Sequence, residues 1–168
     1  MSDQNPYAPP RAEVRDPPSA PDTGELASRK LRFVGAVIDS VISLLVTVPL
    51  GMFTGYWRDA LAGNVDYADA FTIGIASFLA FVALHGKLLA KHGQTIGKRL
   101  VGTRIVNADD EQLPDFGKLL ALRYGVVSLV SLIPAVGSFF ALVDVLLILR
   151  ADRRCVHDHI AGTKVVNA

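Results

Sequence analysis

The stretch Leu31–Trp57, LRFVGAVIDSVISLLVTVPLGMFTGYW, decides the class of fold. Its only charged side chains are Arg32, near the start, and Asp39, inside the stretch. Roughly twenty consecutive apolar residues are enough for a helix to cross the hydrocarbon core of a bilayer. Tyr56 and Trp57 end the stretch with aromatic rings of the kind that are enriched at headgroup level. The stretch therefore predicts a membrane-spanning helix.

Two further apolar blocks follow. The block 70–89 carries no formal charge before Lys87 and predicts a second span. The block 119–149 would be about 46 Å long as one helix, which is too long for a single ordinary crossing. Pro134 and Gly137 interrupt it near the middle. We therefore expect a hairpin with arms near 115–133 and 136–150 and its tip at Pro134.

Charges that flank these blocks predict how the chain is oriented. The loop between the first two blocks carries one arginine against Asp59, Asp66 and Asp69. Basic residues dominate the other three flanks: Arg29, Lys30 and Arg32; Lys87, Lys91, Lys98, Arg99, Arg104 and Lys118; Arg150, Arg153, Arg154 and Lys164. Since cytoplasmic loops are enriched in Lys and Arg, both termini are expected in the cytoplasm and the acidic loop outside.

Composition limits the remaining alternatives. The 168 residues are 51% hydrophobic and 20% charged, with a net charge of +1, so no global field indicates nucleic-acid binding. The one cysteine, Cys155, cannot form an internal disulfide. Six of the nine prolines precede Ser28, and residues 1–28 are expected to be a disordered tail before a single domain at 29–168.

Two short segments repeat each other. Residues 102–108 read GTRIVNA and residues 162–168 read GTKVVNA. Each places a β-branched run after a glycine, which is typical of a strand. We expect residues 103–107 and 163–167 to pair as two short strands at the cytoplasmic surface.

A glycine-containing segment, GQTIGKR at 93–99, precedes the first repeat. Its glycine spacing is too short for a phosphate-binding loop, and Arg99 stands where that motif needs Ser or Thr. We instead expect a turn and a short interfacial helix whose basic side chains meet anionic headgroups. The residues assigned to this cytoplasmic interface are Gln94, Thr95, Gly97, Lys98, Arg99 and His157.

The spacing of the histidines argues against a metal site. His157 and His159 are two residues apart, so a helix would place them on different faces. No metal ion or cofactor is therefore expected. Without a nucleophile and base pair in the sequence, no catalytic residue is assigned and the chain is not expected to be an enzyme.

The chain resembles the RDD family of bacterial membrane proteins, named for one arginine and two aspartates. The resemblance covers about residues 29–168 and is carried by RFVGAVID at 32–39, GQTIGKR at 93–99 and RCVHDHIAGT at 154–163. It puts the family arginine on Arg32 and the first aspartate on Asp39. The second falls on Asp158, with Asp144 as the alternative. The resemblance implies a multi-span membrane domain without specifying a substrate.

Charges inside the apolar blocks need partners. A carboxylate at the centre of a span costs about 2.5–3.5 kcal/mol on translocon scales. Arg32 lies too far along the helix to pair with Asp39, so Lys118 or Arg123 is the expected partner. Asp144 also needs a cation, and Arg123 is the candidate there as well.

The sequence thus predicts an all-α integral membrane fold: two clear spans, a proline-broken helical hairpin and a short cytoplasmic β pairing. The expected role is that of a structural or accessory module organised by Asp39, Arg123 and Asp144. The alternative is a transporter of ions or small solutes in which Asp39 and Asp144 relay charge. Expected partners are anionic lipid headgroups and either another protein or a second copy of the chain. The expected location is a bacterial cytoplasmic membrane.

Overall fold

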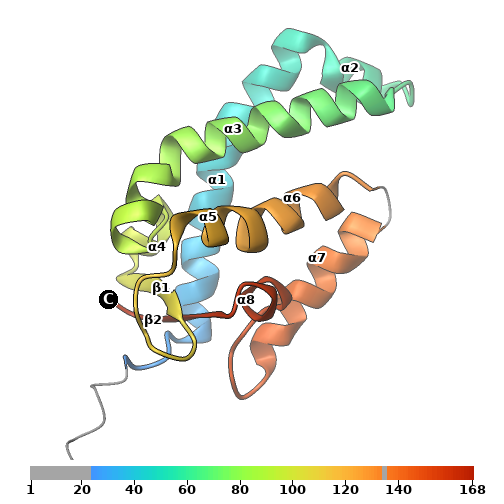
Figure 1. Cartoon of the computed structure of the whole chain (residues 1–168). Coiled ribbons are helices and arrows are strands. Elements are labelled where there is room, and N and C mark those ends of the chain that lie inside the picture. The colour runs from blue at the N-terminus through green and yellow to red at the C-terminus, as the bar shows by residue number, and fades with distance from the viewer. Residues whose placement is uncertain (1–23, 134–135) are drawn as a thin grey trace, which may run out of the picture.

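The computed structural model describes residues 24–133 and 136–168 (Figure 1). The elements are mostly helical, with two strands. In chain order they are α1 (Arg29–Thr54), α2 (Tyr56–Leu61), α3 (Tyr67–His92), α4 (Ile96–Leu100), β1 (Thr103–Asn107), α5 (Phe116–Lys118), η1 (Leu119–Gly125), α6 (Val126–Ser131), α7 (Val136–Leu146), η2 (Leu147–Leu149), α8 (Val156–Ile160) and β2 (Thr163–Asn167). Most of the predicted tail, residues 1–23, lies outside the described residues.

The first long helix, α1, is capped by a serine side chain at its N-terminus and by a glycine at its C-terminus. Ser28 accepts a hydrogen bond from the N–H of Leu31 at its start. Gly55 ends it with φ of 79°, a left-handed conformation that favours glycine. The expected span to residue 57 is therefore three residues too long at this end. Trp57 belongs to α2, and its indole N–H folds back to donate to the carbonyl of Val48 at 3.1 Å.

The second long helix, α3, is also longer than the predicted block 70–89. Asp66 caps its N-terminus and Gly93, with φ of 64°, ends it. Both α1 and α3 have 26 residues, or about 39 Å at 1.5 Å per residue. Both are long and apolar enough to cross a membrane.

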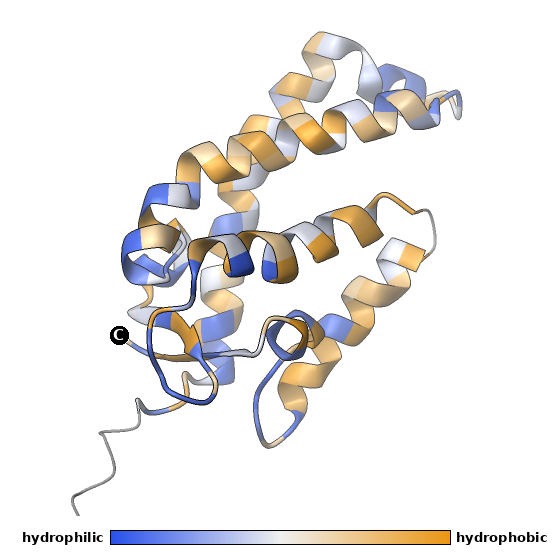
Figure 2. Ribbon diagram, in the orientation of Figure 1, coloured by the Kyte–Doolittle hydropathy of each residue, from blue (hydrophilic) through white to orange (hydrophobic). Residues whose placement is uncertain are grey.

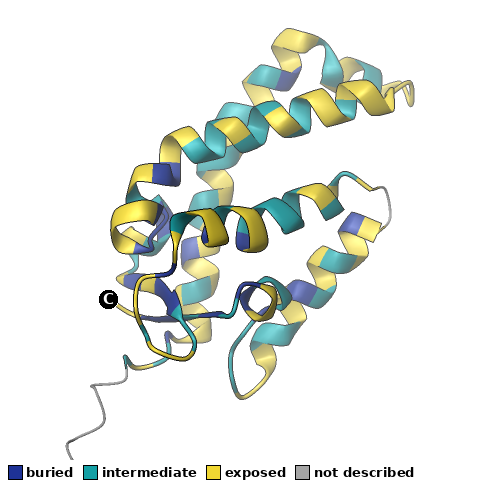
Figure 3. Ribbon diagram, in the orientation of Figure 1, coloured by how far each residue is buried: buried dark blue, intermediate teal, exposed yellow. Residues whose placement is uncertain are grey.

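The apolar side chains of these helices are largely exposed. Only 6% of the most apolar stretch of α1 and 17% of that of α3 is buried in the molecule. Figure 2 shows apolar residues along the middle of α1, α3, α6 and α7, and Figure 3 shows most of the same residues as exposed or intermediate, with few buried. The core helix of a soluble protein is buried, so α1 and α3 do not have that character.

The third apolar block is helical in two arms, as expected. The first arm comprises α5, the π-helical segment η1 and α6, and the second comprises α7 and η2. The arms contact each other through α6 and α7 (Figure 1). The predicted tip, Pro134, lies outside the described residues.

The strand prediction is confirmed. β1 and β2 pair antiparallel, with Thr103 opposite Asn167 and Ile105 opposite Val165. The preceding segment adds to this sheet, because the N–H of Ala27 donates to the carbonyl of Val165 and Leu26 forms a bridge with Val166. The expected disorder of the tail therefore does not extend over residues 24–28, where backbone hydrogen bonds and the burial of Ala27 hold the chain in place.

The packed core lies beside this sheet. Ala27, Leu89, Ile105, Leu119 and Val165 form it, and each is at most 1% exposed. We call this end of the molecule, which carries the sheet, α4 and α8, the sheet end. The start of α1, the end of α3 and both hairpin arms meet there (Figure 1).

Candidate functional site

A buried ion cluster is centred on Asp158 in α8. Oδ2 of Asp158 lies 2.6 Å from Nη2 of Arg32, and Oδ1 accepts from the guanidinium of Arg123. The Thr163 hydroxyl accepts from Arg123 at 2.6 Å and donates to Oδ1 of Asp158 at 3.3 Å. The backbone N–H of Cys155 donates to Oδ2 at 3.1 Å. We call Arg32, Arg123, Asp158 and Thr163 the Asp158 cluster.

The electrostatics of the cluster favour an ionised Asp158. Burial on its own raises the pKa of this carboxyl group, but the positive charges of Arg123 and Arg32 outweigh burial and hold the pKa well below its usual value. Asp158 is fully buried and Arg123 is 2% exposed. Removing one partner from a buried pair typically costs about 3–5 kcal/mol, because the remaining charge stays uncompensated.

Three separate parts of the chain contribute to this cluster. Arg32 comes from the first turn of α1, Arg123 from the π-helical η1, and Asp158 from the first turn of α8. Asp158 also closes a capping box with Cys155 at the start of α8. Arg32 reaches further, to the carbonyl of Arg153 just before α8. The cluster therefore ties α1, the first hairpin arm and the C-terminal segment together.

Asp39 makes a second, separate set of contacts. Its Oδ1 accepts from the backbone N–H of Gly97 at 2.7 Å, and its Oδ2 accepts from the hydroxyl of Thr95 at 2.5 Å. Nζ of Lys98 lies 3.9 Å from Oδ2. Since these donors belong to the start of α4, Asp39 fixes α4 against α1.

The close approach of α4 to α1 depends on glycine. A Cβ on Gly97 would lie 2.2 Å from the carbonyl oxygen of Gly35 and 2.8 Å from the carboxyl carbon of Asp39. Any side chain at position 97 would therefore push α4 away from α1.

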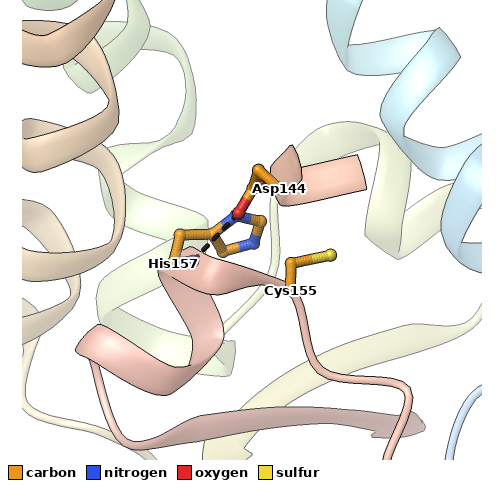
Figure 4. A group of neighbouring side chains, drawn as sticks. All are labelled: Asp144, Cys155 and His157. Carbon is orange, nitrogen blue, oxygen red and sulfur yellow. Dashed lines mark hydrogen bonds and ion pairs between the residues drawn. The ribbon is translucent and has the colours of Figure 1, made fainter. Parts of the chain in front are cut away.

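Asp144 is paired with His157. Oδ2 of Asp144 lies 2.7 Å from Nδ1 of His157, and Oδ1 accepts from the backbone N–H of His157 at 3.0 Å (Figure 4). Burial, together with the charge of Arg123, lowers the pKa of His157, so the imidazole is neutral at neutral pH. A neutral imidazole protonated at Nδ1 satisfies this contact.

The structure separates the predicted charge network into different pairs. Arg123, expected to serve Asp39 or Asp144, is paired with Asp158 instead. Among the described residues no ion pair joins Asp39 to Lys118 or Arg123, and Lys98 is its cationic neighbour. The difference arises because η1 packs against α8 at the sheet end.

The predicted interfacial residues are also mostly turned inward. Thr95 is 1% and Gln94 8% exposed, and the Gln94 amide donates to the carbonyl of Thr103 at 2.9 Å. Gly97 is buried, Lys98 faces Asp39, and His157 is half-buried. Of the six, Arg99 is the exposed one that is free to meet headgroups.

Two cavities adjoin these charges. One, of about 600 Å³, lies between α1, α3 and the first hairpin arm, and the other, of about 440 Å³, lies closer to the start of α1. Both are lined in part by Lys98, Arg123, Asp144 and His157. The larger cavity is also lined by Asp39 and by hydroxyl side chains, namely those of Ser40, Ser43, Thr47, Ser77, Thr95, Ser128 and Ser131.

Sequence reasoning missed several of these partners. Thr163, which bridges Arg123 and Asp158, falls in a predicted strand and in the block RCVHDHIAGT, but the sequence gives it no part in the charge network. The backbone carbonyl of Arg153, which accepts from Arg32, and the backbone N–H of Cys155, which donates to Asp158, could not be predicted, because backbone groups are the same at every position. The serine and threonine positions 40, 43 and 47 follow a helical spacing in α1, and that pattern could have indicated a polar face.

The sequence matches the model of one protein family, described as the RDD family, over residues 26–162. The chain belongs to the RDD family. It is 34% identical over 139 residues to the uncharacterized protein YckC of Bacillus subtilis (strain 168), covering 82% of each chain. It is 26% identical over 141 residues to an uncharacterized protein of Haemophilus influenzae, covering 83% of this chain and 77% of the relative. No solved structure matches the chain.

Within this RDD chain the three residues assigned to the family signature play two different structural parts. Arg32 and Asp158 contact each other directly in the Asp158 cluster. Asp39 instead accepts hydrogen bonds at the start of α4. Asp144, the alternative for the second aspartate, has His157 as its partner.

Proposed function

We propose that this RDD protein is an integral membrane module whose four apolar segments, α1, α3 and the two hairpin arms, enter the bilayer. The observation that supports this most is the exposure of apolar side chains. Phe53 is 92%, Leu45 71% and Phe139 69% exposed. Water would penalise such a surface by about 25 cal/mol per Å², whereas lipid tails would solvate it.

The charges support one orientation. The start of α1, the end of α3 and both arms of the hairpin carry their basic residues at the sheet end. The segment around α2, at the opposite end of α1 and α3, carries Asp59, Asp66 and Asp69. By the positive-inside rule the sheet end faces the cytoplasm, and we assign both termini of the chain to that side of the membrane. We place the protein in the bacterial cytoplasmic membrane, with exposed Arg99 toward anionic headgroups.

The role that the site supports best is structural or accessory. The Asp158 carboxylate is engaged on both oxygens by two guanidinium groups, a hydroxyl and a backbone N–H. A carboxylate held this way is committed to packing and has a pKa far from the values at which it would exchange protons. The module would hold its apolar helices in one arrangement and present them to another membrane protein or to a second copy.

A second candidate is passage of ions or small solutes. The supporting observation is the cavity of about 600 Å³, which is lined by hydroxyl groups and by both Asp39 and Asp144. Polar groups inside a helical bundle frequently mark solute pathways. Asp39 and Asp144 both have hydrogen-bond partners in the structure, which favours the structural role over a charge relay.

Reconstitution separates the two roles. The purified chain in liposomes should conduct monovalent cations no faster than empty liposomes, and mild-detergent extraction should recover it in a complex larger than the monomer. A cation flux that disappears in Asp39→Asn, while that variant melts at the wild-type temperature, would replace the structural role with transport.

A further inference from the structure

One mixed group of metal-binding side chains lies at the junction of α7 and α8. Asp144 comes from α7, Cys155 immediately precedes α8, and His157 is in its first turn. One ligand atom from each residue lies within 4.8 Å of the others. Figure 4 shows Asp144 and His157 joined by their hydrogen bond, with Cys155 on the adjoining stretch of chain and its sulfur pointing away from the pair in this view. The sequence indicated no metal site, because only the spacing of His157 and His159 was considered. Asp144 is thirteen residues before His157 in the chain, and the fold brings the two side chains together.

The three donors match the preferences of one class of ion. A carboxylate oxygen, an imidazole nitrogen and a thiolate sulfur together suit a borderline-soft divalent ion such as Zn²⁺. Three protein ligands leave a fourth position of a tetrahedral ion for water. One thiolate and one carboxylate would balance the two positive charges of the ion.

Neither neighbouring arginine forms an ion pair with Asp144 among the described residues. Arg32 and Arg123 are both paired with Asp158. Nη2 of Arg32 also lies 3.5 Å from Sγ of Cys155, where its N–H would donate to a metal-bound thiolate. Donors of this kind outside the ligand set commonly orient and stabilise thiolate ligands.

The group is accessible from a cavity. Asp144, Cys155 and His157 all line the cavity of about 440 Å³, and Asp144 and His157 also line the larger one. An ion and its water could therefore reach the group without unfolding α8.

We propose that Asp144, Cys155 and His157 bind one divalent ion of the Zn²⁺ class. The ion would replace the hydrogen bond between Oδ2 of Asp144 and Nδ1 of His157, and the neutral imidazole would keep its one proton on the ring nitrogen that does not bind the ion. The Cys155 thiol would give its proton to solvent when the ion binds, because the thiolate is the ligand. Binding adds a bond between α7 and α8.

Cobalt provides a direct test, because Co²⁺ bound to a thiolate has a charge-transfer absorption in the near ultraviolet. The full chain, purified without chelators in detergent, is titrated with Co²⁺ alone and then with Zn²⁺. One Co²⁺ per chain should bind with this absorption, and Zn²⁺ should displace it. Cys155→Ser should abolish the band, and His157→Gln should weaken Co²⁺ binding by at least about tenfold.

His159→Gln is the matched control. His159 is in the same helix, is exposed and lies 3.2 Å from Asp152, so its loss should leave the cobalt band unchanged. Zn²⁺ should also raise the melting temperature of the wild type and of His159→Gln, but not of Cys155→Ser. A folded wild-type chain without a thiolate band, or a band that His159→Gln removes, would overturn the proposal.

Discussion

At the residue scale, Asp158 is the side chain on which most of the buried charge converges. Its negative charge compensates the positive charges of both Arg32 and Arg123. The Thr163 hydroxyl accepts from Arg123 and donates to Asp158, which adds a second link between these two side chains. A resemblance could place Arg32, Asp39 and Asp158 in the sequence. The resemblance could not predict which of the charged side chains form ion pairs. The pairing depends on how η1 packs against α8, and residue spacing within a single helix does not reveal that packing.

Replacing Asp158 should be the most damaging single change among the signature residues. Asp158→Asn keeps the shape but leaves two guanidinium groups without their counter-charge, so we expect a loss of about 3–5 kcal/mol in stability. Thermal unfolding in detergent measures it. Asp152→Asn is the control, because Asp152 is on the same segment but partly exposed, and it should cost under about 0.5 kcal/mol. Equal melting temperatures for the two variants would contradict this.

The contribution of Asp158 should also survive mild acid. Its pKa is held low in the folded state, so its contribution is complete above the unfolded pKa of about 3.9 and is lost as pH falls through the lower folded pKa. The stability gap between wild type and Asp158→Asn should stay constant from pH 8 to about pH 5 and narrow only below about pH 4. A gap that closes near pH 6 would show that another group carries the effect.

Double-mutant cycles should report the pairing directly. Asp158→Asn and Arg123→Gln should couple strongly, since the two side chains touch. Asp39→Asn and Arg123→Gln should be additive within about 0.5 kcal/mol, because their contacts are separate. Melting temperatures of the single and double variants decide between these patterns, and strong coupling in the second pair would restore the network expected from the sequence.

At the element scale, α4 is the short helix that the Asp39 carboxylate holds against α1. The length of the apolar blocks predicted α1 and α3, Pro134 and Gly137 inside the third block predicted the two hairpin arms, and β-branched repeats predicted β1 and β2. Neither signal reveals the π-helical form of η1 or the extra strand-like segment at 24–28, because both depend on tertiary contacts. The burial of Gln94 and Thr95 in the GQTIGKR segment also depends on tertiary contacts, namely those with Thr103 and Asp39.

Gly97→Ala should loosen the crossing of α4 over α1. The added methyl group would overlap the Gly35 carbonyl, so we expect a loss of about 1–3 kcal/mol, measured as a lower melting temperature. Gly86→Ala in α3 is the matched control, because its Cβ would meet only ordinary contacts at 3.5 Å and 3.7 Å. That variant should be neutral or more stable, since alanine favours a helix. A wild-type melting temperature for Gly97→Ala would argue against the close crossing.

At the scale of the whole molecule, the two ends differ in chemistry. The sheet end carries the core, the Asp158 cluster and most basic residues, while the segment around α2 carries acidic ones. Between them lie helices whose apolar surface is exposed. We therefore propose that the bilayer surrounds these helices and that the sheet end faces the cytoplasm.

Cysteine labelling of intact cells tests that claim most directly. In a Cys155→Ser background, Asn64→Cys lies in the acidic connection between α2 and α3, and Ala168→Cys lies at the end of the chain beside β2. Both positions are exposed, so accessibility depends only on the side of the membrane. A membrane-impermeant maleimide should label Asn64→Cys in intact cells and Ala168→Cys only after permeabilisation. Labelling of Ala168→Cys in intact cells, with Asn64→Cys protected, would contradict the account.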